Sequence, residues 1–113
     1  MPESARELFE RVKNQKYEPL LRGVRGTYQF DIKQVGTWFL SVNDGVIIVE
    51  DARPEADCTI SCSEQDFVDI VTGRRNMITA LMQGRIQVRG DLALVQKFHG
   101  VIGARIEEQR GAA

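Results

Sequence analysis

The residues of this chain that could carry chemistry are one histidine, two cysteines and a group of arginines. His99 could act as a general acid or base, but catalysis by it would need a nucleophile and an orienting carboxylate, which its neighbours do not supply. The fingerprints of serine hydrolases, zinc proteases, phosphate loops and dinucleotide sites are absent from the sequence. We therefore predict that the protein is not an enzyme, has no catalytic residue and needs no cofactor.

The two cysteines are predicted to be structural. If Cys58 and Cys62 share a strand, they lie on one face of it about 13 Å apart, which is farther than a disulfide allows. Without a local bend they cannot pair with each other. A single histidine and the absence of C-x-x-C spacing also leave a zinc site without ligands. We expect two buried thiols and no metal site.

The arginines form the densest basic set of the sequence. Guanidinium groups suit the phosphate or carboxylate head group of a ligand, which they can bind through paired hydrogen bonds. The alternative is an ordinary solvated face, because most exposed arginines do nothing specific. The candidate head-group contacts are Arg74, Arg75, Arg85 and Arg89.

The composition is that of an ordinary globular protein. With 113 residues, of which 42% are hydrophobic and 27% charged, the chain fits a single domain over residues 1–113. Fifteen Lys and Arg against sixteen Asp and Glu give a net charge of -1, which argues against nucleic-acid binding and leaves at most transient membrane-surface contact. No apolar run approaches the roughly 20 residues that span a bilayer, and the N-terminus lacks signal-peptide character, so we expect a cytoplasmic protein.

Hydrophobic periodicity predicts the elements of the first half of the chain. A capping-box pattern at Ser4 and Glu7 begins a helix over residues 4–15. Alternation of apolar and polar side chains then predicts three strands, and the Asn-Asp-Gly sequence between the last two is a strong hairpin signal. These strands, which we expect to form an antiparallel meander, cover residues 27–33, 37–42 and 46–51.

The second half of the chain alternates between strands and helices. Ser63 is placed to cap one helix that Gly73 ends, and Asp91 is placed to cap a last helix that continues to about residue 102. The other expected elements are a loop at residues 52–56, strands at 57–63 and 85–89, a helix at 76–83 and a frayed tail at 107–113. Together they predict an α+β fold, in which four to five helices cover one face of a five-stranded, mainly antiparallel sheet.

The order and spacing of these elements resemble the sterol carrier protein 2 family. The resemblance covers about residues 20–105 and is nearest to the small stand-alone bacterial members. It implies an apolar tunnel between sheet and helices that accepts sterols, fatty acids, fatty acyl-CoA or phospholipids, and it implies binding or transfer rather than turnover. The segments that carry it are GTYQFDI at 26–32, WFLSVNDG at 38–45, ADCTISCS at 56–63, GRRN at 73–76, ALMQGRI at 80–86 and VRGD at 88–91.

The resemblance makes the apolar faces of these elements candidate ligand contacts. Methionine side chains adapt to ligands of varying shape, and a helix near a chain end can open at modest free-energy cost. The alternative for each residue is core packing, which every amphipathic helix needs, and Trp38 in particular could anchor the sheet. The candidate ligand-binding residues are Trp38, Leu40, Ile60, Phe67, Ile70, Val71, Met77, Ile78, Leu81, Met82, Phe98 and Ile102.

Two functions are consistent with this sequence. The first is binding, with intracellular transfer or presentation, of a lipid or another long apolar molecule, including sterol-like and quinone-like ligands; each buried methylene contributes about 0.8 kcal/mol. The second is a non-catalytic interaction or accessory domain whose partner is an enzyme of a lipid or quinone pathway. Residues 110–113 carry no recognisable peroxisomal signal, so we do not expect peroxisomal delivery.

Overall fold

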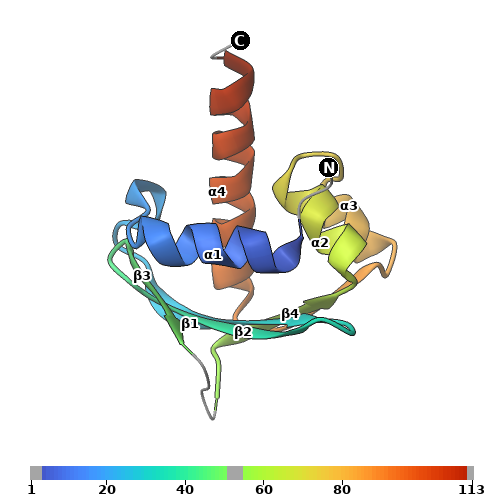
Figure 1. The fold of residues 1–113 in the computed structure, drawn as a ribbon, viewed down its shortest axis with the longest axis horizontal. Helices are drawn as coiled ribbons and strands as arrows, with labels where there is room; N and C mark the ends of the chain where they lie inside the picture. Colours follow the sequence, from blue (N-terminus) through green and yellow to red (C-terminus); the bar gives the residue numbers. More distant parts are fainter. Residues whose placement is uncertain (1–3, 51–54, 112–113) are drawn as a thin grey trace.

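The computed structural model describes residues 4–50 and 55–111, with the side chains of the last helix described as far as Arg105. The expected loop at residues 52–56 and the last residue of the third strand, Asp51, fall wholly or partly outside these ranges. The elements are α1 Ala5–Gln15, a short 3-10 helix η1 Pro19–Leu21, β1 Arg25–Ile32, β2 Gly36–Asn43, β3 Val46–Glu50, β4 Cys58–Cys62, α2 Glu64–Val71, α3 Met77–Met82, β5 Ile86–Gly90 and α4 Leu92–Gly111 (Figure 1).

The five strands form one sheet in the order β3-β2-β1-β4-β5. The β1–β2, β2–β3 and β4–β5 pairs are antiparallel, as expected for a mainly antiparallel sheet. The β1–β4 pair is parallel, with Tyr28 beside Cys58 and Ile32 beside Cys62. The sheet is therefore mixed, and alternating hydrophobicity could not reveal this because both pairings have the same side-chain period.

All the helices that the structure describes lie on one face of the sheet, and none of them lies on the other face (Figure 1). The alternation in β1 turns Tyr28, Phe30 and Ile32 toward the helices, and all three side chains are buried. On β3 the same period buries Ile47 and leaves Ile48 exposed. The predicted α+β architecture is confirmed, with four α-helices over a five-stranded sheet.

The helices begin at the polar side chains that the sequence indicated. The Ser4 hydroxyl accepts a hydrogen bond from the amide of Glu7 at 3.2 Å. The Ser63 hydroxyl accepts one from the amide of Asp66 at 3.1 Å. Each cap satisfies an amide that would otherwise lack a partner in the first turn, so these helix starts are encoded locally.

The last helix is longer than expected. The apolar stripe stops near Ile102, yet α4 continues to Gly111, and the part of residues 107–113 that the structure describes is helical rather than frayed. The residues after Gly103 are mostly strong helix formers, and no proline or capping signal interrupts them. Our boundary was wrong because a helix can continue beyond the point where its side chains stop packing.

Both cysteines are free and almost completely buried in β4. Burial disfavours the thiolate and raises the pKa of the Cys58 thiol to about 12, and the pKa of Cys62 is raised to about 12 for the same reason. Such thiols stay protonated and act as small apolar side chains. The expectation of buried structural thiols is confirmed.

Candidate functional site

A cavity of about 310 Å³ lies between the helices and the covered face of the sheet. Its walls come from α1, η1, the three strands of the meander, α2 and α4, so elements from both halves of the chain line it. The apolar side chains that line it are Leu8, Phe9, Val12, Leu21, Tyr28, Phe30, Leu40, Val42, Ile47, Phe67, Val71, Phe98, Val101 and Ile102.

Aromatic rings form one wall of the cavity. The Phe30 ring lies 5.4 Å from Phe9, 5.9 Å from Phe67 and 5.2 Å from Phe98, measured between ring centroids. Because these four residues belong to α1, β1, α2 and α4, the ring contacts tie three helices to the central strand. Such contacts stabilise the packing beyond the burial of apolar area alone.

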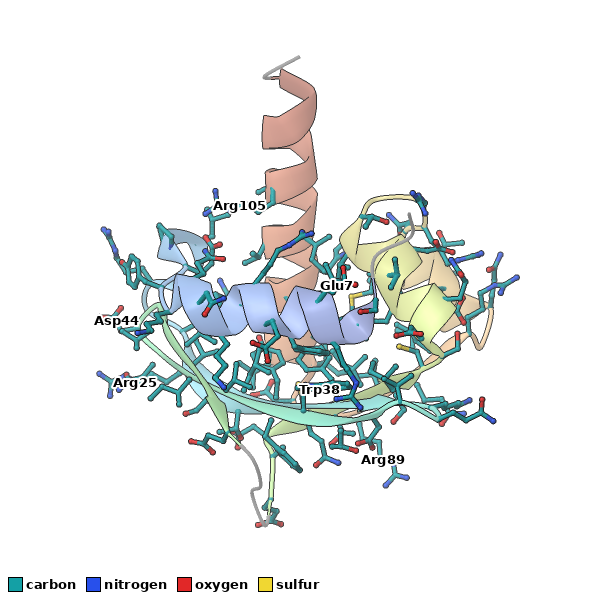
Figure 2. All side chains as sticks on the ribbon, viewed as in Figure 1. Glu7, Arg25, Trp38, Asp44, Arg89 and Arg105 are labelled. Atoms are coloured by element: carbon teal, nitrogen blue, oxygen red, sulfur yellow. The ribbon has the colours of Figure 1, made fainter. Side chains whose placement is uncertain are left out.

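The cavity is polar at one end. Glu18, in the segment between α1 and η1, is only 5% exposed, and its carboxylate accepts hydrogen bonds from Arg105 of α4, from the Leu20 amide at 3.0 Å and from Gln15 at 3.3 Å. Figure 2 shows the Arg105 side chain reaching from α4 toward this segment. Arg11, one helical turn before Gln15, also lines the cavity.

The Glu18–Arg105 ion pair attaches the distal part of α4 to the first half of the chain. Burial alone would raise the pKa of Glu18, but the hydrogen bonds from Arg105, Leu20 and Gln15 outweigh it and hold the pKa below its ordinary value of 4.5. The carboxylate is therefore charged at neutral pH and neutralised by Arg105. Acid or a competing anion would weaken this contact at the polar end of the cavity.

We predict that Glu18→Gln lowers the free energy of unfolding by about 1–3 kcal/mol at neutral pH, because it removes a charged hydrogen-bond acceptor. The folded-state pKa of Glu18 lies below the unfolded one, so this contribution is fully present above the unfolded value and disappears as the pH falls through the folded value. Urea unfolding of the wild-type protein and of Glu18→Gln, from neutral to acidic pH, measures the difference between their free energies of unfolding. This difference should become smaller below a pH of about 4.5.

The exposed Glu10 of α1 provides a matched control. Glu10→Gln makes the same change on a side chain that faces solvent, and such surface substitutions usually alter stability by less than about 0.5 kcal/mol. A Glu18→Gln effect that remained constant into strong acid, or that matched the Glu10→Gln effect, would contradict the role of the ion pair.

The structure brings five of the candidate ligand-binding residues together at this cavity. They are Leu40, Phe67, Val71, Phe98 and Ile102. Trp38 lies between α1 and the sheet (Figure 2), where its ring stacks on Phe9 at 4.6 Å, but it is not part of the cavity lining.

The remaining candidates lie away from the cavity. Ile60, Ile70 and Met77 are buried in the core without being part of its lining, at 2–4% exposure. On the outer side of α3, three apolar side chains reach solvent instead, namely Ile78, Leu81 and Met82.

The candidate head-group arginines also lie away from the cavity lining. Arg75 and Arg85 both lie near the Asp66 carboxylate, at 3.7 and 3.6 Å, while Arg89 points away from the helices on the uncovered face of the sheet (Figure 2). Their head-group role stays a prediction. In the part of the chain that the structure describes, no cluster of three or more His, Cys, Asp or Glu side chains could hold a metal ion.

Sequence reasoning missed the α1 side of the cavity and its polar end. Leu8, Phe9 and Val12 were visible as an apolar stripe, and their helical spacing could have suggested a wall. Glu18 and Arg105 carried no such signal, because they are 87 residues apart and Arg105 lies beyond the expected end of its helix. Only the packing of α4 against η1 brings them together.

The structure is thus a small α+β domain with an apolar cavity between a mixed sheet and a single layer of helices. The profile of the SCP-2 sterol transfer family matches residues 5–103. The chain therefore belongs to the SCP-2 sterol transfer family, whose domains bind or transfer lipids. None of the helices in the described part of the chain is long and apolar enough to cross a membrane.

Individual relatives agree with this assignment. The chain is 29% identical over 101 residues to hydroxysteroid dehydrogenase-like protein 2 of Xenopus tropicalis, over 86% of this chain and 24% of that protein. It is 26% identical over 99 residues to human sterol carrier protein 2, over 82% of this chain and 18% of that protein. The chain thus spans about a quarter or less of these curated relatives.

A solved structure of similar size matches over nearly its whole length. The solution structure of palmitated SCP2L2 from Aedes aegypti superposes with a TM-score of 0.70 and 26% identity, covering 88% of this chain and 95% of that one. The shared fold therefore includes both the sheet and its helical cover.

Proposed function

We propose that this domain binds one long apolar molecule in the cavity between its helices and sheet. The domain then transfers the molecule or presents it to an acceptor. The observation that carries the proposal is the cavity itself, whose lining is apolar except at the end occupied by Arg11, Gln15, Glu18 and Arg105. An elongated apolar chain with one polar end has the same distribution of chemistry. The palmitated relative from Aedes aegypti supports the choice of an acyl chain.

The size of the cavity favours a slender ligand. At about 310 Å³ it is at the low end of the range for small-molecule pockets. Each methylene that leaves water contributes about 0.8 kcal/mol, so an acyl chain gains affinity from its length alone. A bulkier ligand would require the walls to separate, and two polar interactions oppose such separation on the α4 side. One is the Glu18–Arg105 ion pair, and the other is the hydrogen bond that the Tyr28 hydroxyl donates to the Leu94 carbonyl at 2.7 Å.

Native mass spectrometry of freshly purified protein, followed by solvent extraction and lipid analysis, tests this proposal. We expect one bound apolar molecule per chain, or one fluorescent fatty acid taken up per chain when the protein is purified empty. If one fluorescent fatty acid binds per chain and an unlabelled fatty acid displaces it, the result would support an internal site. Consistent failure to find or load any apolar molecule would contradict the proposal and favour an accessory domain that binds only protein.

A further inference from the structure

Helix α3 presents an apolar surface to solvent, although its opposite side is already packed. Met77 and Ala80 are buried against the rest of the domain. Ile78, Leu81 and Met82, spaced at i, i+3 and i+4, share the outer side and are 39%, 36% and 83% exposed. A helix that is apolar on both sides is normally buried on both. The outer side of α3 therefore lacks a partner within the described residues.

Basic side chains border this surface. Residues 74–90 contain four arginines and no acidic residue, in a chain whose net charge is -1. Arg74 and Arg75 precede α3 and Arg85 follows it. The Asp66 carboxylate lies near Arg75 and Arg85, so this one negative charge offsets only one of the two positive charges beside it.

We propose that the α3 surface, defined as Ile78, Leu81 and Met82 with the bordering Arg74, Arg75 and Arg85, docks onto an anionic lipid bilayer. Protruding apolar side chains enter the boundary between head groups and acyl chains, and arginines at the same level pair with lipid phosphates. Met82 suits this role because its flexible thioether adapts to a disordered environment.

The form of the surface favours a bilayer over a protein partner. One protruding and two partly exposed side chains on a short helix offer far less area than the roughly 1,000 Å² that a specific protein interface needs. A bilayer needs no complementary shape, and its anionic lipids supply negative charges with which the arginines can pair. The contact would be weak and reversible, as suits a carrier that must leave the membrane. Only the choice of a lipid surface as the occupant rests on the proposed function.

Docking through α3 would also bring the cavity close to its source of ligand. α3 follows α2 in the chain, and the two helices lie together at the same end of the helical layer (Figure 1). Phe67 and Val71 of α2 line the cavity. A membrane bound at α3 would therefore lie on the side of the domain where α2 forms the cavity wall.

Flotation with vesicles tests the proposal. We expect the wild-type protein to float with vesicles of two parts phosphatidylcholine to one part phosphatidylglycerol, and much less with phosphatidylcholine alone, with added salt weakening the binding. Met82→Asp should reduce the bound fraction about tenfold or more, because the bilayer opposes burial of a carboxylate. Ile48→Asp is the matched control, since Ile48 is 55% exposed on β3 and faces away from the helices.

A second pair of variants tests the charges. Arg74→Glu should weaken flotation, whereas Arg25→Glu, which reverses an exposed charge on the other side of the molecule (Figure 2), should not. Equal effects of Met82→Asp and Ile48→Asp, or no wild-type binding to the anionic vesicles, would overturn the proposal and leave a protein as the occupant of the surface.

Loading with a fluorescent fatty acid in the absence of vesicles separates this proposal from the proposed function. Met82 does not line the cavity, so Met82→Asp should load like the wild-type protein. If the wild-type protein floats with the vesicles but takes up no fatty acid, the internal site is rejected and the docking surface is retained. Loss of loading together with flotation in Met82→Asp would show that the substitution acts through the cavity, and would overturn docking by α3.

Discussion

Replacing Phe30 with alanine is expected to lower the free energy of unfolding by about 3–5 kcal/mol, the usual cost of removing a buried phenylalanine side chain. The Phe30 side chain is 1% exposed, lies on the central strand of the sheet and contacts the rings of Phe9, Phe67 and Phe98. Its removal would enlarge the existing cavity and remove the ring contacts that join three helices to the central strand. Equilibrium unfolding in urea, monitored by circular dichroism, measures the loss.

Phe39 provides the matched control for this substitution. It lies on the neighbouring strand β2 but on the uncovered face of the sheet, where it is half-buried. Phe39→Ala removes the same atoms without opening a void between the layers, so its cost should be clearly smaller. If the two variants lost equal stability, the ring cluster around Phe30 would not be the centre of the core.

Replacing Val71 with tryptophan is expected to weaken the binding of a fluorescent fatty acid by about tenfold or more. The Val71 side chain is half-buried at the end of α2 and lines the cavity. An indole at this position would occupy space otherwise available to the ligand, and excluding as few as two methylenes removes about 1.6 kcal/mol of binding free energy. Titration of the empty protein with the fatty acid measures the affinity.

Two measurements show whether the loss comes from the cavity. Thermal unfolding should remain cooperative, because the larger side chain enters existing space rather than a filled core. Val46→Trp makes the same replacement at an exposed position on β3 outside the cavity, and it should bind the fatty acid like the wild-type protein. Unchanged affinity in a well-folded Val71→Trp variant would place the ligand elsewhere.

The secondary structure could be predicted because its signals are local. Ser4 and Ser63 cap their helices through amides three residues away. The alternation in β1 places its apolar residues on the buried face. The end of α4 could not be predicted in the same way, since the residues after Ile102 form helix through backbone propensity and leave no apolar pattern to mark its end.

The candidate site could be predicted only in part. Phe67, Val71, Phe98 and Ile102 lie on apolar helix faces, and these faces do reach the cavity. The same type of pattern in α3 gave Ile78, Leu81 and Met82, which face solvent. The helical spacing of apolar residues indicates that a helix has an apolar face. It does not indicate which of two apolar faces packs against the sheet.

The sequence by itself determined the class of fold, the family and the inward faces of the strands, because periodicity, capping and motif spacing depend on residues that are near one another in the chain. The tertiary structure alone decided the parallel pairing of β1 with β4, the position of the cavity and the pairing of Glu18 with Arg105. These features join segments that are distant in the sequence, and what brings them together is the packing of the helical layer onto the sheet.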